Sequence, residues 1–249
     1  GTTVVDAPNL GWSGVALEKA FGGLTENTAQ ALPIAPVRAV NDTRLAARVE
    51  IEHRPGSSFL YLRGETGIGG AVVLDGTILG GENGWAGEIG HVVISPDGPT
   101  CRCGRRGCVE AYASHHALRA SAGLSADVPI EDLIGSLSAA AGGRAAVIDQ
   151  MGRPLGLALA GAMNVLDLST VVLGGYLGEI ATDLAPVLTR IIGDHALAAE
   201  GGTIAVLAAE APGDSALDGA VRTALAPVLA DPAAWISSRD PAPVLSTPG

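Results

Sequence analysis

The stretch CRCGRRGC, residues 101–108, contains every cysteine of the chain. Ten positions upstream of its first cysteine stands His91, which closes the run GEIGH, residues 87–91. Three thiolates and one imidazole form a complete tetrahedral ligand set for Zn²⁺ of the closed, structural kind. The spacing H-x9-C-x-C-x4-C therefore predicts a structural zinc site with four ligands. These ligands are His91, Cys101, Cys103 and Cys108.

A disulfide framework is the main alternative for these cysteines. An odd number of cysteines fits such a framework poorly, and Cys101 and Cys103 are too close in sequence to bridge without strain. Unrelated buried thiols would be scattered through apolar segments, whereas these lie among glycines and arginines. Free thiols in a metal-type spacing also agree with a reducing compartment, so we expect a cytoplasmic protein.

Composition excludes several classes of function. The 249 residues, 47% of them hydrophobic, are enough for one large core or two smaller lobes. Neither a signal peptide nor an apolar run of about twenty residues occurs, which disfavours secretion and membrane spanning. A net charge of −11 has the wrong sign for a nucleic-acid surface. The basic cluster Arg102, Arg105 and Arg106 is too small for a DNA footprint, so we expect no direct contact with DNA or membrane.

Strands alternate with helices along most of the chain, which indicates an α/β architecture. Expected strands span residues 58–62, 71–74, 170–173 and 203–207, and Asp75-Gly76 is a hairpin signal. Expected helices span residues 15–21, 109–120, 145–165, 179–192 and 217–229, together with an amphipathic helix that begins at Asn41-Asp42. Pro154 is expected to kink or divide the longest helix. We expect a loop over residues 2–12 and an extended segment over residues 36–40.

Four glycine-rich or cysteine-rich motifs together resemble the ROK family of repressors, open reading frames and sugar kinases. They are Gly67-Ile68-Gly69-Gly70, Asp75-Gly76, the GEIGH run and the cysteine stretch that leads to Glu110. The resemblance runs from about Pro8 to Leu229. It implies an α/β protein with the two-lobed actin-like ATPase (ribonuclease H-like) fold. The start of the first lobe would be missing from this chain.

The resemblance also implies a division of the chain and an assembly. Residues 1–40 would be the remnant of the N-terminal lobe. Residues 41–236 would hold the sugar-binding, zinc-containing part and the C-terminal lobe, and residues 237–249 a flexible tail. The family relation further implies a homodimer. No pattern in the sequence itself indicates dimerisation.

The family's functional residues can be carried to matching positions of this chain. Sugar hydroxyls would be bound by Asn41, Asp42, Glu88, His91 and Glu110. His91 would place one ring nitrogen on zinc and the other on the sugar, since metal coordination fixes its tautomer. In a kinase, Asp42 would be the base that activates the attacking hydroxyl, and ATP with Mg²⁺ would be held at two glycine-rich turns. The residues of these turns are Thr66, Gly67, Gly69, Gly70, Gly174 and Gly175.

Each role has a purely structural alternative. Asn41 is also a good helix cap, and Asp42 suits the positive end of a helix dipole. Glu88 and Glu110 could be solvated or paired with arginines. The glycines could serve only tight turns, because a glycine run by itself is a weak signal. The remaining histidines lack acidic or cysteine neighbours, and we expect them at the surface or an interface. They are His53, His115, His116 and His195.

This chain departs from the pattern of the family's kinases in two places. The Asp-x-Gly-x-Thr turn with which the kinases begin does not occur in this chain, through truncation or through evolution. Where kinases read Gly-Thr-Gly, the chain reads Gly64-Glu65-Thr66-Gly67. A like charge 4 Å from a phosphate costs about 1 kcal/mol in bulk water and about 4 kcal/mol at an effective dielectric near 20.

These departures favour the effector-binding and dimerising part of a sugar-responsive transcriptional regulator. Its effector would be a sugar or sugar phosphate, and DNA would be contacted only through an upstream domain absent from this chain. The alternative is an ATP-dependent hexose kinase with Asp42 as base. A third hypothesis is a pseudo-enzyme that binds sugar within a metabolic complex.

Overall fold

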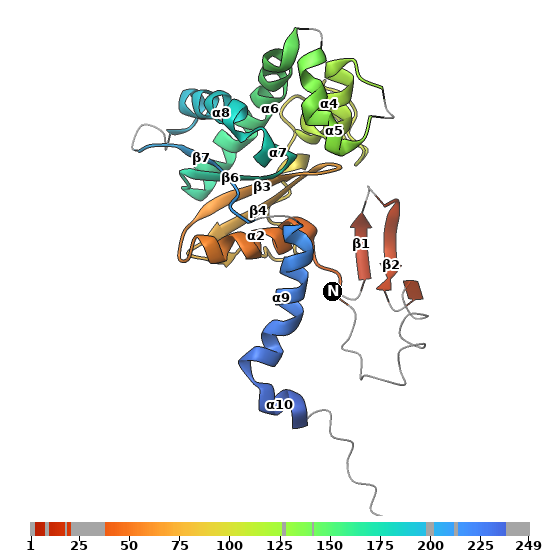
Figure 1. The fold of residues 1–249 in the computed structure, drawn as a ribbon, viewed down its shortest axis with the longest axis vertical. Helices are drawn as coiled ribbons and strands as arrows, with labels where there is room; N and C mark the ends of the chain where they lie inside the picture. Colours follow the sequence, from red (N-terminus) through yellow and green to blue (C-terminus); the bar gives the residue numbers. More distant parts are fainter. Residues whose placement is uncertain are drawn as a thin grey trace, which may run out of the picture.

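A five-stranded mixed sheet forms the centre of the molecule (Figure 1). The computed structural model describes residues 3–7, 10–17, 19–20, 38–125, 128–140, 142–197, 202–211 and 214–237. The strand order is β5-β4-β3-β6-β7, with bounds Thr77–Ile78, Ile68–Leu74, Phe59–Gly64, Thr170–Gly175 and Ala205–Ala208. β3 runs antiparallel to β4 and parallel to β6. The predicted α/β architecture is therefore confirmed.

Alternating side chains of the central strand β3 face two separate hydrophobic clusters. Phe59 and Tyr61 pack with the small residues of α2 (Asp42–His53), while Leu60 and Leu62 belong to the larger cluster on the other face. Figure 1 shows α2 and α9 (Ser215–Ala230) below the sheet. The helices α6 (Gly143–Leu166), α7 (Tyr176–Glu179) and α8 (Ala181–His195) lie above it. The sheet is thus covered on both faces.

A group of short elements surrounds the cysteine stretch, and most of them pack on α6 while η1 packs on β4. It comprises η1 (Ile89–His91), α3 (Glu110–Ala113), α4 (His115–Ala122), α5 (Ile130–Ser136) and η2 (Leu137–Ala139). The prediction of a single helix over residues 109–120 is wrong, because the helix is interrupted at Ser114. Ser114 has extended backbone angles, and its hydroxyl oxygen accepts from the N–H of Ala117 as the N-cap of α4.

Several other expectations need correction. α6 is not divided at Pro154. The helix expected over residues 179–192 is confirmed as α8, which begins two residues later at Ala181 and follows the short helix α7. The opening segment forms an antiparallel hairpin of β1 (Thr3–Ala7) and β2 (Trp12–Ala16), where we expected a loop. Strand β2 also replaces the start of the helix expected over residues 15–21.

The hairpin turn between β4 and β5 is confirmed. Asp75 and Gly76 both have positive φ, of 48° and 71°, the combination that a type I′ turn needs. The expected extended segment falls partly outside the described residues, and so does almost all of the tail over 237–249. Residues 38–40 lie in no helix or strand.

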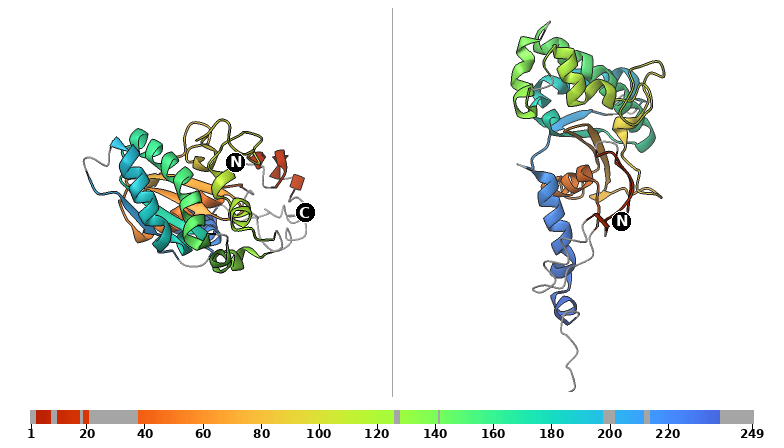
Figure 2. Two further views of the ribbon diagram at one scale, coloured as in Figure 1. Left: turned by 90° about the horizontal axis from the view of Figure 1, so that it is seen from above. Right: turned by 90° about the vertical axis from the view of Figure 1, so that its right-hand side faces the viewer.

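The C-terminal helices extend from the body of the molecule. α9 packs against α2 at its start, where a Cβ at Gly219 would lie 2.0 Å from the carbonyl oxygen of Leu45. Beyond this contact, α9 and α10 (Pro232–Ser237) reach away from the sheet, as the side view in Figure 2 shows. In the part of the chain that is described, no helix has both the length and the apolar character to cross a membrane.

Candidate functional site

The four predicted zinc ligands come together. One donor atom from each of His91, Cys101, Cys103 and Cys108 lies within 4.8 Å of all the others. Cys103 Sγ is 3.8 Å from Cys108 Sγ, and Cys101 Sγ is 3.8 Å from His91 Nδ1. Sulfur ligands 2.3 Å from a tetrahedral zinc stand about 3.8 Å apart, so these donors fit the metal in number, type and spacing. With Nδ1 facing the thiols, Nε2 is the nitrogen left for a ligand.

The thiols differ in their acidity. Burial raises the pKa of Cys101 to about 12; the backbone N–H of Cys103 opposes this shift, whereas the Cys103 thiol and the Glu110 carboxylate add to it. Burial also raises the pKa of Cys108. At Cys103 burial acts in the same direction, but hydrogen bonds from Arg105 and the other two cysteines outweigh it and lower the pKa to about 7. A cation is the natural partner that would convert all three to thiolates.

The zinc loop, residues 91–108, owes its shape to local backbone contacts. Short antiparallel bridges pair Thr100 with Arg106 and Val93 with Cys108. Gly107 has φ 73°, and a Cβ there would lie 1.6 Å from the carbonyl oxygen of Ser95. Only glycine fits at this position, and it lets the strand-like segment before Cys108 turn back toward His91.

Glu110 connects the zinc loop to the sheet. Its side chain is buried, and Oε2 accepts from the N–H of Ile68 at 3.0 Å. Its other oxygen lies 3.7 Å from Cys101 Sγ. Glu110 is therefore neither solvated nor paired with an arginine, and its position depends on the first residue of β4.

The first three residues of β4 form the meeting point of the site. A Cβ at Gly69 would lie 2.0 Å from Thr43 Oγ1 of α2, and one at Gly70 would lie 2.3 Å from the carbonyl oxygen of Gly87. Gly90 packs closely against Ile68 of the same strand, and a Cβ at Gly90 would lie 2.1 Å from the carbonyl oxygen of Ile68. These glycines are explained by close packing. Their predicted contact with phosphate stays a prediction.

Asn41 and Asp42 stand at the start of α2. Asn41 is its N-cap, and Oδ1 accepts from the N–H of Arg44 at 3.1 Å, so the structural alternative is observed. Arg44 in turn donates to the carbonyl oxygens of Gly80 and Ala86, which joins α2 to the segment before Glu88. Glu88 itself is half-buried and precedes η1.

Asp42 belongs to a cluster of charges around Arg63 that the sequence did not reveal. The Arg63 guanidinium lies 3.3 Å from Asp42 Oδ2, 3.0 Å from Glu65 Oε1 and 3.7 Å from Asp214 Oδ1. The Arg63 side chain is 10% exposed, whereas its partners are 46–65% exposed. We call these four residues the Arg63 cluster.

The two turns predicted to hold a nucleotide face each other across β3 and β6. Gly64 pairs with Gly175, and Gly175 has φ 57°. A Cβ at Gly175 would lie 2.1 Å from the carbonyl oxygen of Gly64 and 3.0 Å from Glu65 Oε1. Glu65 therefore reaches over the second turn. Thr66 is exposed at the tip of the first turn, where the N–H of Glu65 donates to the carbonyl oxygen of Gly67.

His115 does not lie at the surface, although it was one of four histidines expected at the surface or an interface. It is buried, and its Nδ1 lies 3.2 Å from the carbonyl oxygen of Glu65. Its ring contacts that of His116, with centroids 4.0 Å apart. Nearby, the hydroxyl of the fully buried Tyr176 donates to the carbonyl oxygen of Ala113, and burial raises the pKa of Tyr176 well above its usual value. The two turns are thus tied to α3 and α4.

The predicted sugar residues form two groups. His91 and Glu110 gather at the zinc loop, while Asn41 and Asp42 sit at α2. Among the described residues, no hydrogen bond or ion pair links Asp42 to Glu88, His91 or Glu110. The two groups meet through the start of β4, which contacts both.

This arrangement defines an α/β protein of the actin-like ATPase fold with a Cys₃His loop beside its central sheet. The chain belongs to the ROK family, whose model matches residues 1–226. It is 34% identical over 172 residues to the N-acetylmannosamine kinase of Salmonella typhimurium, covering 64% of this chain and 57% of that one. The chain therefore spans little more than half the length of the curated relatives it matches.

Solved structures of both branches resemble the chain. A ROK glucokinase from Streptomyces griseus, in complex with glucose and AMPPNP, has a TM-score of 0.69 at 25% identity over 89% of this chain and 76% of that one. A ROK transcriptional regulator described as a homologue of E. coli Mlc has a TM-score of 0.68 at 27% identity, over 88% and 57%. Kinases predominate among the similar proteins, so the comparisons favour the kinase alternative over the regulator expected from Glu65.

Proposed function

We propose that this chain is the sugar-binding part of a ROK sugar kinase, which transfers phosphate from ATP to a sugar hydroxyl. The relatives' names support the activity. One observation carries the site: the start of β4 packs against α2, which begins at Asp42, and against the segment that carries Glu88, His91 and Glu110. A ring of hydroxyls between these groups would find carboxylates and an imidazole as partners.

In this proposal, each residue has a defined task. Asp42 accepts the proton of the attacking hydroxyl. Glu88, Glu110 and His91 Nε2 orient the sugar through its other hydroxyls, and Asn41 adds an amide. ATP with Mg²⁺ supplies the phosphoryl group, held by the turns at Thr66–Gly70 and Gly174-Gly175. Zinc would fix the ring of His91 through Nδ1.

The Arg63 cluster sets a condition for this chemistry. Arg63 lies 3.3 Å from Asp42 Oδ2, the kind of oxygen that must accept the proton. A neighbouring cation favours the ionised carboxylate and so makes it a weaker base, an effect that would be relieved if the charge of Arg63 were shared with the phosphates of ATP. Arg63 would then move from Asp42 toward the nucleotide when both substrates are bound.

The same cluster favours a second candidate, the effector-binding part of a transcriptional regulator. Glu65 holds Arg63 at 3.0 Å and reaches over Gly175, in the space proposed for phosphates. A carboxylate there disfavours ATP. A sugar or sugar phosphate would then shift the balance between two lobe arrangements, and a separate DNA-binding domain would respond. Homodimerisation belongs to this candidate as a prediction of the family relation.

An ADP-release assay on the full-length protein separates the candidates. With ATP, Mg²⁺ and either N-acetylmannosamine or glucose, the kinase proposal expects turnover that falls at least ~100-fold in Asp42→Asn. Asp149→Asn, a change to an exposed acid on α6, is the matched control and should leave turnover intact. Turnover that survives Asp42→Asn contradicts its role as base. Calorimetric sugar binding without any turnover overturns the kinase and supports the regulator.

A further inference from the structure

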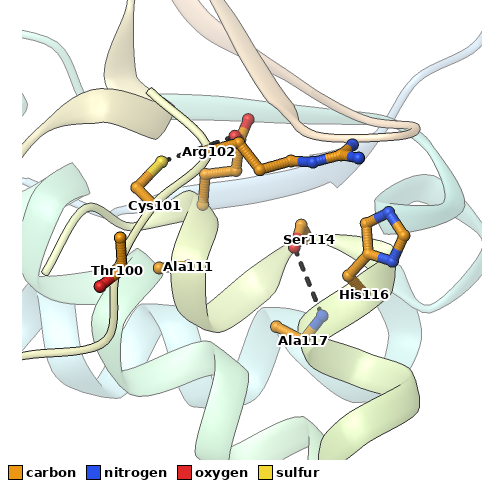
Figure 3. A pocket seen from close by; sticks show the side chains of 8 residues that line it. Thr100, Cys101, Arg102, Ala111, Ser114, His116 and Ala117 are labelled. Carbon is orange, nitrogen blue, oxygen red and sulfur yellow. Dashed lines mark hydrogen bonds between the residues drawn. The ribbon is translucent and has the colours of Figure 1, made fainter. Parts of the chain in front are cut away.

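His115 is the only buried histidine among the described residues, and the chemistry proposed above does not use it. It is the first residue of α4. The start of this helix is fixed by Ser114, whose hydroxyl oxygen accepts from the N–H of Ala117 (Figure 3). The His115 ring also packs against that of His116, with centroids 4.0 Å apart. The backbone and the ring of His115 are thus both held in place.

The partner of His115 is the turn between β3 and β4. Its Nδ1 lies 3.2 Å from the carbonyl oxygen of Glu65, a residue that is 50 positions away in the chain. A carbonyl oxygen can only accept a hydrogen bond, so Nδ1 must carry the hydrogen and donate it. The start of α4 is thereby joined to one of the two turns proposed to hold ATP.

Glu65 is held at three points. Its side chain pairs with Arg63 at 3.0 Å, and its N–H donates to the carbonyl oxygen of Gly67 at 3.0 Å. The bond from His115 adds the third point, at the carbonyl oxygen. The first residue of the turn therefore has its side chain and both of its backbone polar groups engaged.

The middle of the turn offers two backbone donors. In the part of the chain that the structure describes, the N–H groups of Thr66 and Gly67 donate to no acceptor. The next N–H, that of Ile68, is already used by Glu110 at 3.0 Å. Successive unpaired N–H groups on a turn suit an anion such as a phosphate. The direction of these two donors then decides whether the turn can bind a nucleotide.

The hydrogen bond from His115 sets the direction of one of these donors. The Glu65 carbonyl and the Thr66 N–H belong to the same peptide group, and the described chain contains no cis peptide bond. In a planar trans peptide, the carbonyl and the N–H point in opposite directions. While His115 holds the carbonyl, the Thr66 N–H is therefore held facing away from His115. Without that bond, the peptide group would be less restrained and the donor would turn with it.

We infer that His115 is a positioning residue for the nucleotide: its Nδ1–H holds the Glu65–Thr66 peptide group so that the Thr66 N–H donates to a phosphate of ATP. The inference rests on the proposed kinase function and adds a determinant of nucleotide affinity to it. Among the described residues, no hydrogen bond joins His115 to a proposed sugar-binding residue. Loss of the His115 bond should therefore affect ATP and leave the sugar unaffected.

Steady-state kinetics on the full-length protein tests the inference with a matched pair of variants. Leucine and asparagine have similar shapes, but only asparagine carries an N–H close to the position of Nδ1. His115→Leu should raise the KM for ATP about 3- to 10-fold, the range that one hydrogen bond covers. His115→Asn should restore most of this loss. The KM for N-acetylmannosamine or glucose should stay unchanged in both variants.

Two further variants serve as controls. His115→Gln carries its amide farther out, near the position of Nε2, and should not restore the affinity for ATP. If His115→Leu fails to fold, the comparison of His115→Asn with His115→Gln decides the question. His195→Leu makes the same change at an exposed histidine of α8 and should alter neither KM. Calorimetry with the non-hydrolysable analogue AMPPNP and Mg²⁺ measures nucleotide affinity independently of turnover.

The outcomes separate the inference from the proposed function. If turnover is normal and the KM for ATP is unchanged in His115→Leu, the inference alone is overturned. Equal increases in both KM values, or a His115→Asn protein as impaired as His115→Leu, also overturn it, because His115 would then be merely structural. AMPPNP binding that depends on His115 without any turnover supports the inference and contradicts the kinase. A parent protein that binds sugar but no AMPPNP overturns both.

Discussion

The zinc loop and the Arg63 cluster are two polar sites of the same molecule, assembled in opposite ways. The four ligands of the zinc loop lie within residues 91–108, and short bridges and tight glycine turns bring them together. The Arg63 cluster draws Asp42 from α2, Arg63 and Glu65 from the end of β3, and Asp214 from the start of α9. The first is a local structure, whereas the second exists only because distant segments pack.

The difference shows where function is encoded. The zinc loop, together with the glycine motifs, identifies the family but is compatible with either branch. In the proposed kinase, the Arg63 cluster would bear on catalysis, because it engages the proposed base Asp42 and places Glu65 over Gly175. The local motif therefore indicates the family, whereas the dispersed charge cluster bears on the activity that we propose. Substitutions in each region should differ in size and in sensitivity to salt.

The largest effect is expected from Cys108→Ser, because it removes one of four ligands at a fully buried position. Structural zinc contributes folding free energy directly. We expect substoichiometric zinc by elemental analysis and a melting temperature lowered by about 10 °C, which corresponds to roughly 3 kcal/mol for a protein of this size. Gly80→Ala, where nothing lies within 4 Å of the added Cβ, should change neither quantity. A fully stable Cys108→Ser protein would contradict a structural metal.

A smaller loss is expected from Gly90→Ala, which leaves all ligands in place. The added Cβ would lie 2.1 Å from the Ile68 carbonyl oxygen, so η1 must shift away from β4. Overpacking of this kind costs about 1–3 kcal/mol. Chemical denaturation measures the loss, and competition with a zinc chelator should reveal weaker metal binding because His91 moves too.

Gly80→Ala provides the matched control, because nothing lies within 4 Å of a Cβ at Gly80. Its stability and zinc affinity should match those of the parent protein. If Gly90→Ala behaves like this control, the zinc loop is independent of the sheet. The zinc loop would then be an entirely local structure, in full contrast to the Arg63 cluster.

Arg63→Gln should cost about 1–2 kcal/mol, since three carboxylates would face one another without their common cation. Because the partners are about half exposed, salt should screen the repulsion. Denaturation at 0.1 M and about 1 M NaCl should therefore show a loss that shrinks with salt. Adding Glu65→Gln should recover part of it. A loss independent of salt would indicate that Arg63 acts through packing alone.

The smallest effect is expected from Asp149→Asn. Asp149 pairs with Arg190 at 3.3 Å, and both side chains are more than half exposed. Exposed pairs contribute about 0–1 kcal/mol, so the melting temperature should shift by no more than about 2 °C. A shift as large as that of Arg63→Gln would remove the distinction between a buried, shared arginine and a surface pair.

Much of the secondary structure could be predicted from the sequence. The cap at Asn41, the Asp75-Gly76 hairpin and the apolar strand before Gly174 have local signals, and each is present. The misses also have physical reasons. Ser114 interrupts a helical pattern because its side chain caps the next helix, and α6 accommodates Pro154 within a long helix that is buried on the sheet.

The candidate site likewise contains some residues that could be predicted from the sequence and others that could not. His91 and the three cysteines were predicted as ligands because the required residue types occur at a metal spacing over a short stretch. Arg63 carried no signal, since a lone arginine in a strand has many uses. His115 was expected at the surface or an interface, because neither its burial nor its contact with Glu65 can be read from its neighbours in sequence.

The sequence by itself determined the family, the Cys/His set that could hold a metal and the alternation of strands and helices, because these depend on residue types at short range. Only the tertiary structure decided that β4 is shared by α2 and the zinc loop, that Arg63 holds Asp42, and that His115 is buried against the carbonyl oxygen of Glu65. These features depend on strand register and helix packing between residues far apart in the chain. Close contacts and Coulomb interactions act through space, so they appear only once the chain is folded.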